Sequence, residues 1–212
     1  MKKLTSSFGL MALLVLSLSA PVQADLIVDT GTPNLTGSAL PLDSYQWLAA
    51  EFTTTASASQ IDALQGYITA QDSNQAGTTF TVALYGNTTN SANKDIPDLA
   101  TGELFSGQST FNTDGWNGLQ SLNVALDPGT YWVAFEVRGT DSLAGLMPVY
   151  APSPVQTAYN DNTANFGYVP TTGTAYNFGV QVSAVPIPPA LRMFATGLFA
   201  MVGRRFGKRK TV

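Results

Sequence analysis

The sequence predicts an all-β protein, a two-sheet β-sandwich, from three observations. Short runs of alternating apolar residues recur through the middle of the chain, as in Phe80, Val82 and Leu84. Segments rich in Asn, Asp, Gly and Pro separate these runs. Away from the two ends of the chain, no segment keeps the 3.6-residue period of an amphipathic helix. About eight or nine short strands between residues 25 and 184 suit a jelly roll, with a small barrel as the alternative topology.

The best-patterned strands are expected in the runs 79–85, 122–126, 131–137 and 176–182. The second run leads into Asp127-Pro128-Gly129, a strong turn signal. In the third run, period-2 alternation places Phe135 on the inward face. Weaker strands are expected at 26–29, 46–53, 61–69, 103–106 and 145–150, and long polar loops at 71–78, 87–101 and 152–174.

The N-terminal residues 1–24 have the three parts of a secretory signal peptide. Lys2 and Lys3 precede an apolar stretch at 8–18, and Pro21-Val22-Gln23-Ala24 ends with small residues at positions −3 and −1. This pattern predicts cleavage by signal peptidase between Ala24 and Asp25, which leaves 25–184 as one domain. An uncleaved N-terminal helix is the alternative.

The C-terminal residues 185–212 also fall into three parts. The motif Val185-Pro186-Ile187-Pro188-Pro189-Ala190 is followed by an apolar segment and by the basic residues Arg204, Arg205, Lys208, Arg209 and Lys210. The prolines exclude a helix interior and keep the motif extended. As a helix, 187–203 would span roughly 25 Å, which is short for a permanent membrane anchor. We therefore expect a hydrophobic sorting helix that stops in the membrane temporarily, with an uncleaved tail anchor as the alternative.

This tripartite tail resembles the PEP-CTERM sorting signal in its V-P-[L/I]-P variant, found on secreted proteins of Gram-negative bacteria. The resemblance implies processing by exosortase, a membrane protease-transpeptidase, after transient contact with the inner membrane. It also implies a final place at the cell surface or in the extracellular, biofilm-type matrix. Arg192 departs from the pattern, because the family usually has an aromatic or apolar residue there.

The middle of the chain carries a second resemblance. Residues 45–140 contain in order Phe52-Thr53-Thr54, the run 61–69, Val82-Ala83-Leu84-Tyr85-Gly86, Ile96-Pro97-Asp98-Leu99, Trp116 and the run 126–133. This order is similar to the jelly-roll choice-of-anchor domains that bacteria join to such surface signals. The similarity implies a fold more than a function, because those domains mostly lack assigned activities.

Composition narrows the chemistry of the domain. All 14 acidic residues lie between Asp25 and Asp161 and are balanced there only by Lys94 and Arg138, so the domain carries a formal charge of −12. Such a surface repels nucleic acid. The chain has no histidine, which removes the usual Ser-His and Cys-His nucleophile pairs, and no cysteine for disulfides.

We therefore expect a non-enzymatic structural protein of the surface or of extracellular polysaccharide, without catalytic residues, resident cofactor or metal. A carbohydrate-binding module stays open, because Trp132 shares a half-polar strand face with Glu136 and Arg138 and is a candidate for stacking on sugars. Calcium is a further possibility, since Asp72–Gly77 only partly matches a calcium loop and looser sites form from Asp- and Asn-rich loops. A glycan hydrolase is the second alternative, and it would need two carboxylates close together.

Overall fold

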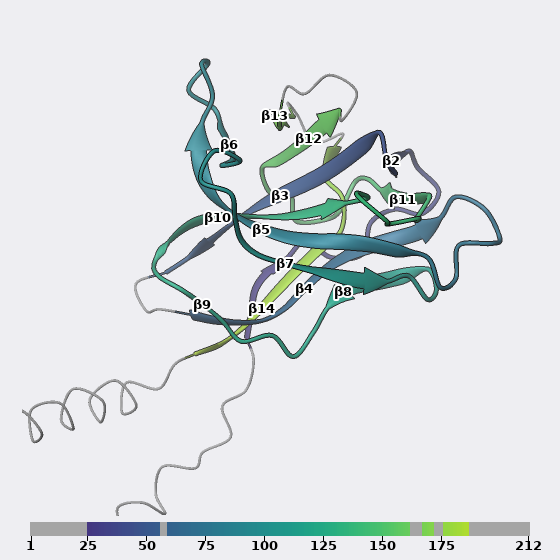
Figure 1. Cartoon of the computed structure of the whole chain (residues 1–212), viewed down its shortest axis with the longest axis horizontal. Helices are drawn as coiled ribbons and strands as arrows, with labels where there is room; N and C mark the ends of the chain where they lie inside the picture. Colours follow the sequence, from purple (N-terminus) through teal and green to yellow (C-terminus); the bar gives the residue numbers. More distant parts are fainter. Residues whose placement is uncertain (1–24, 56–58, 162–166, 172–175, 187–212) are drawn as a thin grey trace, which may run out of the picture.

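Two antiparallel β-sheets face each other across one apolar core (Figure 1). The computed structural model describes residues 25–55, 59–161, 167–171 and 176–186. The first sheet has the order β1 (Asp25–Asp29), β14 (Val180–Pro186), β4 (Ser59–Ala70), β11 (Gly145–Pro148) and β2 (Ala39–Leu42), with β8 (Gly115–Leu119) and β9 (Val124–Leu126) also paired to β4. The second has the order β13 (Val169–Pro170), β12 (Thr157–Asp161), β3 (Gln46–Thr54), β10 (Gly129–Glu136), β5 (Thr79–Thr89) and β6 (Asp95–Pro97), with β7 (Glu103–Thr110) also paired to β5.

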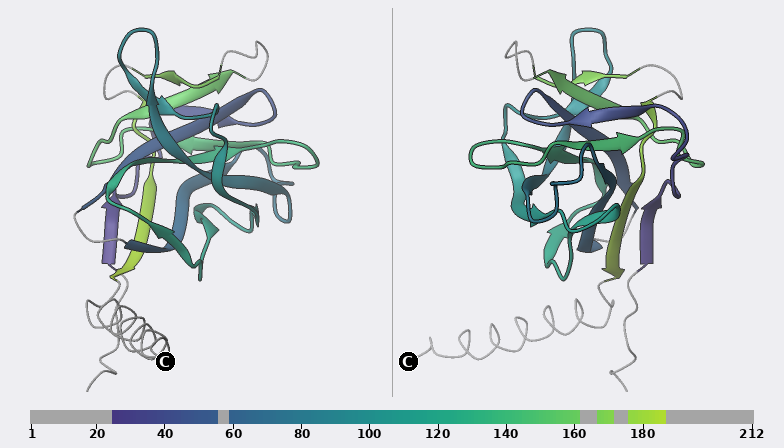
Figure 2. Two further views of the ribbon diagram at one scale, coloured as in Figure 1. Left: turned by 60° about the vertical axis from the view of Figure 1, so that its left-hand side comes forward. Right: turned by 90° about the vertical axis from the view of Figure 1, so that its right-hand side faces the viewer.

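The all-β prediction is confirmed, and the two curled sheets are consistent with a β-sandwich (Figure 2). Strands form in all the predicted runs, although the last one begins only at Val180. The loop prediction was wrong for 152–174, which contains β12 and β13, and for parts of 87–101, which contain the end of β5 and β6. These strands carry polar residues that pair along the backbone without apolar alternation, so their sequence resembles that of a loop.

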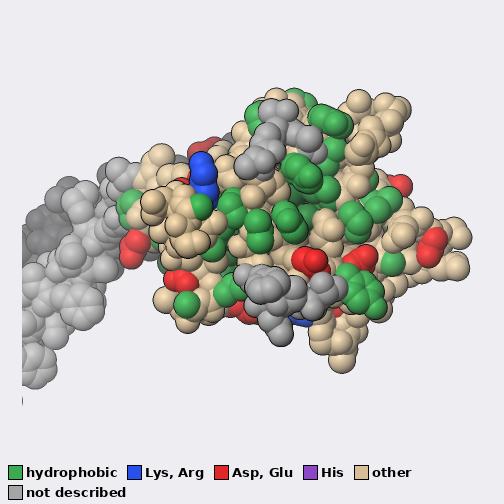
Figure 3. All heavy atoms as spheres, turned by 90° about the horizontal axis from the view of Figure 1, so that it is seen from above, with side chains coloured by type: hydrophobic (Ala, Val, Ile, Leu, Met, Phe, Trp, Pro, Cys, Tyr) green, Lys and Arg blue, Asp and Glu red, His purple; other side chains and the backbone are tan. Residues whose placement is uncertain are grey.

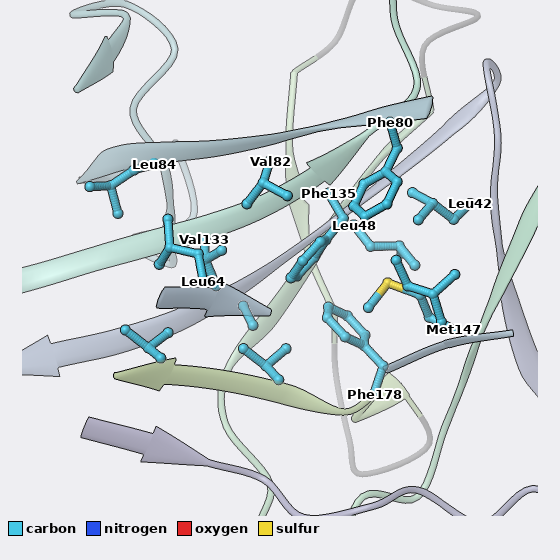
Figure 4. Packing of buried hydrophobic residues seen from close by; sticks show 14 of the residues in the cluster. Leu42, Leu48, Leu64, Phe80, Val82, Leu84, Val133, Phe135, Met147 and Phe178 are labelled. Carbon is cyan, nitrogen blue, oxygen red and sulfur yellow. The ribbon is translucent and has the colours of Figure 1, made fainter. Parts of the chain in front are cut away.

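The core between the sheets is filled by the inward side chains of the alternating runs (Figure 4). Phe135 is fully buried there, as its alternation predicts. It shares the cluster with Leu64 on β4 and with Phe178, which lies just before β14. A side chain at Gly66 could not fit, since a Cβ there would lie 2.8 Å from the Met147 side chain and 2.9 Å from the Phe135 ring. The packing of Met147 and Phe135 against β4 thus requires a glycine at position 66.

Both ends of the described domain lie at the same pole of the sandwich (Figure 2). β1 runs antiparallel to β14, and Asp25 pairs with Ala184. β14 continues to Pro186, two residues past the predicted domain boundary, and pairs Val185 with Gln60 and Pro186 with Ser59 on β4. No helix in the part of the chain that the structure describes is long and apolar enough to cross a membrane. The two predicted terminal helices lie outside the described residues.

Candidate functional site

The outer face of the second sheet carries a second, small core. The outward alanines of four neighbouring strands have little or no exposed surface, and aromatic side chains cover them. The buried members are Ala49, Ala83, Tyr85, Trp132, Ala134, Ala158 and Tyr168, and Trp47 and Ile96 pack against them. Because the buried members are covered by these neighbours, this face of the sheet is largely covered by the protein itself. Seen from the side of β12 and β13, further hydrophobic side chains gather at the surface across the middle of the molecule (Figure 3).

Trp132 belongs to this covered face, and the prediction that it stacks on sugars was wrong. Its exposed fraction is 0%, and its indole nitrogen Nε1 donates a hydrogen bond to Asn87 Oδ1 at 2.8 Å. Alternation correctly assigned Trp132 to the face opposite Phe135. Alternation shows which face of the sheet a side chain lies on, but not whether other residues bury that face. Here Tyr168 and Ile96 pack in the same cluster as Trp132, and both come from segments predicted to be polar loops.

Glu136 is the most unusual group on the covered face, because it is a carboxyl with no exposed surface. Its Oε1 accepts hydrogen bonds from the hydroxyls of Tyr85 at 3.0 Å and Tyr168 at 2.7 Å. Its Oε2 lies 3.0 Å from Arg138 Nη1 but outside hydrogen-bond geometry, and it accepts no hydrogen bond from the described residues. Arg138 also pairs with Glu103. One cation thus lies between two carboxyl groups at the edge of the small core.

The electrostatics of this cluster follow from burial. Removal from water raises the pKa of Glu136, although the hydrogen bond from Tyr168 and the charge of Arg138 oppose the shift. Burial and the neighbouring Glu136 raise the pKa of the Tyr168 hydroxyl well above its ordinary value. The hydrogen bond from Arg138 lowers the pKa of the exposed Glu103. Glu103 and Glu136 both pair with Arg138, and Glu136 has no exposed surface through which a substrate could reach it.

The outer face of the first sheet is open and carries a different set of side chains. Trp116 on β8 pairs directly with Tyr67 on β4, and both side chains are partly exposed. Their ring centroids are 5.4 Å apart with an interplanar angle of 85°, an edge-to-face contact. Because the rings are nearly perpendicular, their faces point in different directions. We call this pair, Trp116 and Tyr67, the aromatic corner.

A row of polar side chains runs beside this aromatic corner. Gln65 on β4 pairs with Gln181 on β14, and Gln181 pairs with Asp29 on β1. Gln181 Nε2 donates a hydrogen bond to Asp29 Oδ1 at 3.2 Å. Gln65 makes no side-chain hydrogen bond to the described residues and is partly exposed. Gly118, on the other side of Gln65, has no side chain. Neighbouring strands lie about 4.8 Å apart, so the row spans roughly 10 Å.

Sequence reasoning missed this row for a physical reason. Tyr67 and Gln65 lie in a predicted strand, but nothing in the sequence gives the register that puts Gln181 and Trp116 beside them. No strand was predicted at Trp116, because the nearby Gly115 and Gly118 are typical of turns. The only available signal was the alternation of Gln65 and Tyr67 with the buried Leu64 and Ile68.

Carboxylates in the acidic loops accept hydrogen bonds from residues two or three positions further along the chain. Asp72 Oδ1 accepts hydrogen bonds from the Asn74 backbone at 2.9 Å and from Gln75 Nε2 at 3.0 Å, which lower its pKa. Asp98 Oδ2 accepts a hydrogen bond from the Thr101 hydroxyl at 2.7 Å, and this bond lowers the pKa of Asp98. Among the described residues, no three His, Cys, Asp or Glu side chains are grouped so as to hold a metal ion.

The residues of the predicted processing sites are only partly within the described structure. Asp25 is the first residue of β1, and Val185 and Pro186 are the last two of β14. Ala24, the rest of the Pro-rich motif from Ile187 to Ala190, and the basic residues Arg204, Arg205, Lys208, Arg209 and Lys210 lie outside the described residues.

No protein-family model matches this chain, and no curated protein is significantly similar to it.

Proposed function

We propose that this chain is an exported, non-enzymatic surface protein of a Gram-negative bacterium. Signal peptidase releases it between Ala24 and Asp25, and an exosortase then processes its C-terminal tail. The β-sandwich, which we assign to the jelly-roll topology, stays at the cell surface or in extracellular polysaccharide as a structural protein. The segments before Asp25 and after Pro186 are the signal helix and the sorting helix in this proposal.

The observation that supports the proposal most is the pairing of Asp25 with Ala184. It brings the exits of both predicted membrane-directed segments to one pole of the domain (Figure 2). A chain held in the membrane by either end can then fold on one side of it without reaching around the sandwich. The acidic domain, with a formal charge of −12, is also repelled by anionic lipid headgroups, which favours extension away from the membrane.

The end of β14 gives the proposal a second support. Pro186 is the last strand residue. Proline has no backbone N–H to donate, so it is disfavoured inside a sheet but tolerated at a strand end, where no further hydrogen bond along the strand is needed. The Pro-rich motif therefore begins inside the sheet. Removal of the chain beyond Pro186 would leave all the described strands intact.

Mass spectrometry of the mature protein from an exosortase-bearing host tests this function. We expect an N-terminus at Asp25 and loss of the basic tail. Pro188→Ala combined with Pro189→Ala should leave a longer, membrane-held species, because the extended substrate conformation is weakened. The matched control combines Pro152→Ala with Pro154→Ala, two exposed loop prolines, and should be processed normally. A released protein that retains its basic tail, or normal processing in a host without exosortase, would contradict the proposal.

A further inference from the structure

From the open face of the first sheet we infer that the domain binds single chains of a neutral polysaccharide across Trp116, Tyr67, Gln65 and Gln181. This inference goes beyond the proposed function, because residence at the cell surface does not itself require sugar binding. It depends only on the described strands β1, β4, β8 and β14 and is independent of how the tail is processed.

The aromatic corner supplies the stacking part of the site. The C–H groups on one side of a pyranose ring form an apolar face that packs on a flat aromatic ring. Trp116 and Tyr67 are partly exposed, in contrast to the fully buried Trp132. With an interplanar angle of 85°, one ring can stack under a sugar while the other contacts the edge of that sugar.

The polar row supplies the hydrogen bonds. A carboxamide both donates and accepts, which matches the mixed donor and acceptor character of a sugar hydroxyl. Gln65 lies beside the aromatic corner with its side chain free of hydrogen bonds to the described residues, and Gln181 continues the row to Asp29. The row spans roughly 10 Å across three strands, about the length of a disaccharide. The face thus fits a chain that crosses the strands.

Charge selects the class of polysaccharide. Asp29 lies at one end of the row, and the domain as a whole is strongly acidic. Of its two basic residues, Arg138 is engaged by Glu103 and Glu136 on the other sheet. Uronic-acid polymers would therefore meet like charge, whereas neutral hexose polymers would not.

Ring geometry selects single chains over crystalline surfaces. A crystalline polysaccharide presents a flat surface, and adsorption to it needs several aromatic rings in one plane. Trp116 and Tyr67 are nearly perpendicular and cannot both face such a surface. The corner instead fits one sugar of a soluble chain.

Affinity electrophoresis of the full chain, in a non-glycosidic detergent, tests the inference. The probes are native gels containing hydroxyethylcellulose, konjac glucomannan or dextran, and parallel gels containing alginate. We expect retardation in at least one neutral gel and none in alginate. Trp116→Ala should weaken binding about tenfold, which corresponds to ~1.4 kcal/mol, and Gln65→Ala should weaken it to a smaller extent. Crystalline cellulose should not pull the protein down.

The matched control is Tyr45→Ala, which removes a 68% exposed aromatic side chain, the most exposed aromatic among the described residues, from the turn before β3. It should bind as the parent protein does. If Trp116→Ala fails to fold by circular dichroism, Trp116→Phe and Gln65→Ala keep the test decisive. The inference is overturned by absence of retardation in every neutral gel, by equal losses in Tyr45→Ala and Trp116→Ala, or by preferential binding to alginate or to crystalline cellulose.

Discussion

The two outer faces of this sandwich consist of similar alternating strands, yet one is buried and the other is open. On the second sheet, Trp132 and the alanines around it have no exposed surface. On the first sheet, Trp116 and Gln65 keep part of theirs. The cover over the second sheet comes from single residues such as Tyr168, in segments that are mostly polar. One aromatic side chain from a mostly polar segment can therefore help to bury a sheet face that would otherwise be exposed to solvent.

The sharpest test of this difference compares the two tryptophans. Trp132→Ala should lower the free energy of unfolding by about 3–5 kcal/mol, because it leaves a cavity in a closed cluster. Trp116→Ala should lower it by less than about 2 kcal/mol, since the side chain is partly exposed and an edge-to-face contact contributes roughly 0.5–1.5 kcal/mol. Urea unfolding of the two variants measures both losses. Equal losses would mean that the two faces are buried alike.

A glycine substitution tests how closely β8 approaches β4 on the open face. A Cβ at Gly118 would lie 2.1 Å from the Leu64 carbonyl oxygen, so Gly118→Ala must push the strands apart. We expect a loss of about 1–3 kcal/mol in the free energy of unfolding. Gly86→Ala is the control, because a Cβ at Gly86 meets nothing within 4 Å. A loss from Gly118→Ala no larger than that of the control would show that β8 is mobile on β4.

The smallest effect concerns the pH dependence of the covered face. Because burial raises the folded-state pKa of Glu136, its contribution to stability is present below the ordinary glutamate pKa and is lost as pH rises through the raised value. The stability of the parent protein relative to Glu136→Gln should thus fall as pH rises. Glu103→Gln is the control, for which we expect the opposite dependence of stability on pH. The pKa of Glu103 is lowered by Arg138, so its contribution is lost as pH falls.

Urea unfolding at a series of pH values from about 2.5 to 8 compares the pH dependence of the two variants, because the effect of Glu103 is expected below the ordinary glutamate pKa and that of Glu136 above it. A flat difference between the parent protein and Glu136→Gln would show that Glu136 is hydrated in the folded protein.

Period-2 alternation was sufficient to place Phe135 inward and Trp132 outward, because successive strand residues point to opposite faces. It could not show that Trp132 is covered, since Tyr168 reaches it through tertiary contacts. The neighbours of Gln65 were equally hidden, because they depend on the register of β14 and β8. The sequence therefore predicted the faces of the strands, whereas the candidate site required their pairing.

The pairing of β14 on both sides has a mechanical consequence. A pull on the chain beyond Pro186 acts first on this strand, which is paired with β4 from Val180 to Pro186 and with β1 from Gln181 to Ala184. A strand that is pulled along its own axis between two neighbours has to slide against both of them at once. The backbone hydrogen bonds to both neighbours then share the force, instead of breaking one after another. In a protein held by its C-terminal end, the strand next to the attachment point is thus built to resist shear, as under liquid flow.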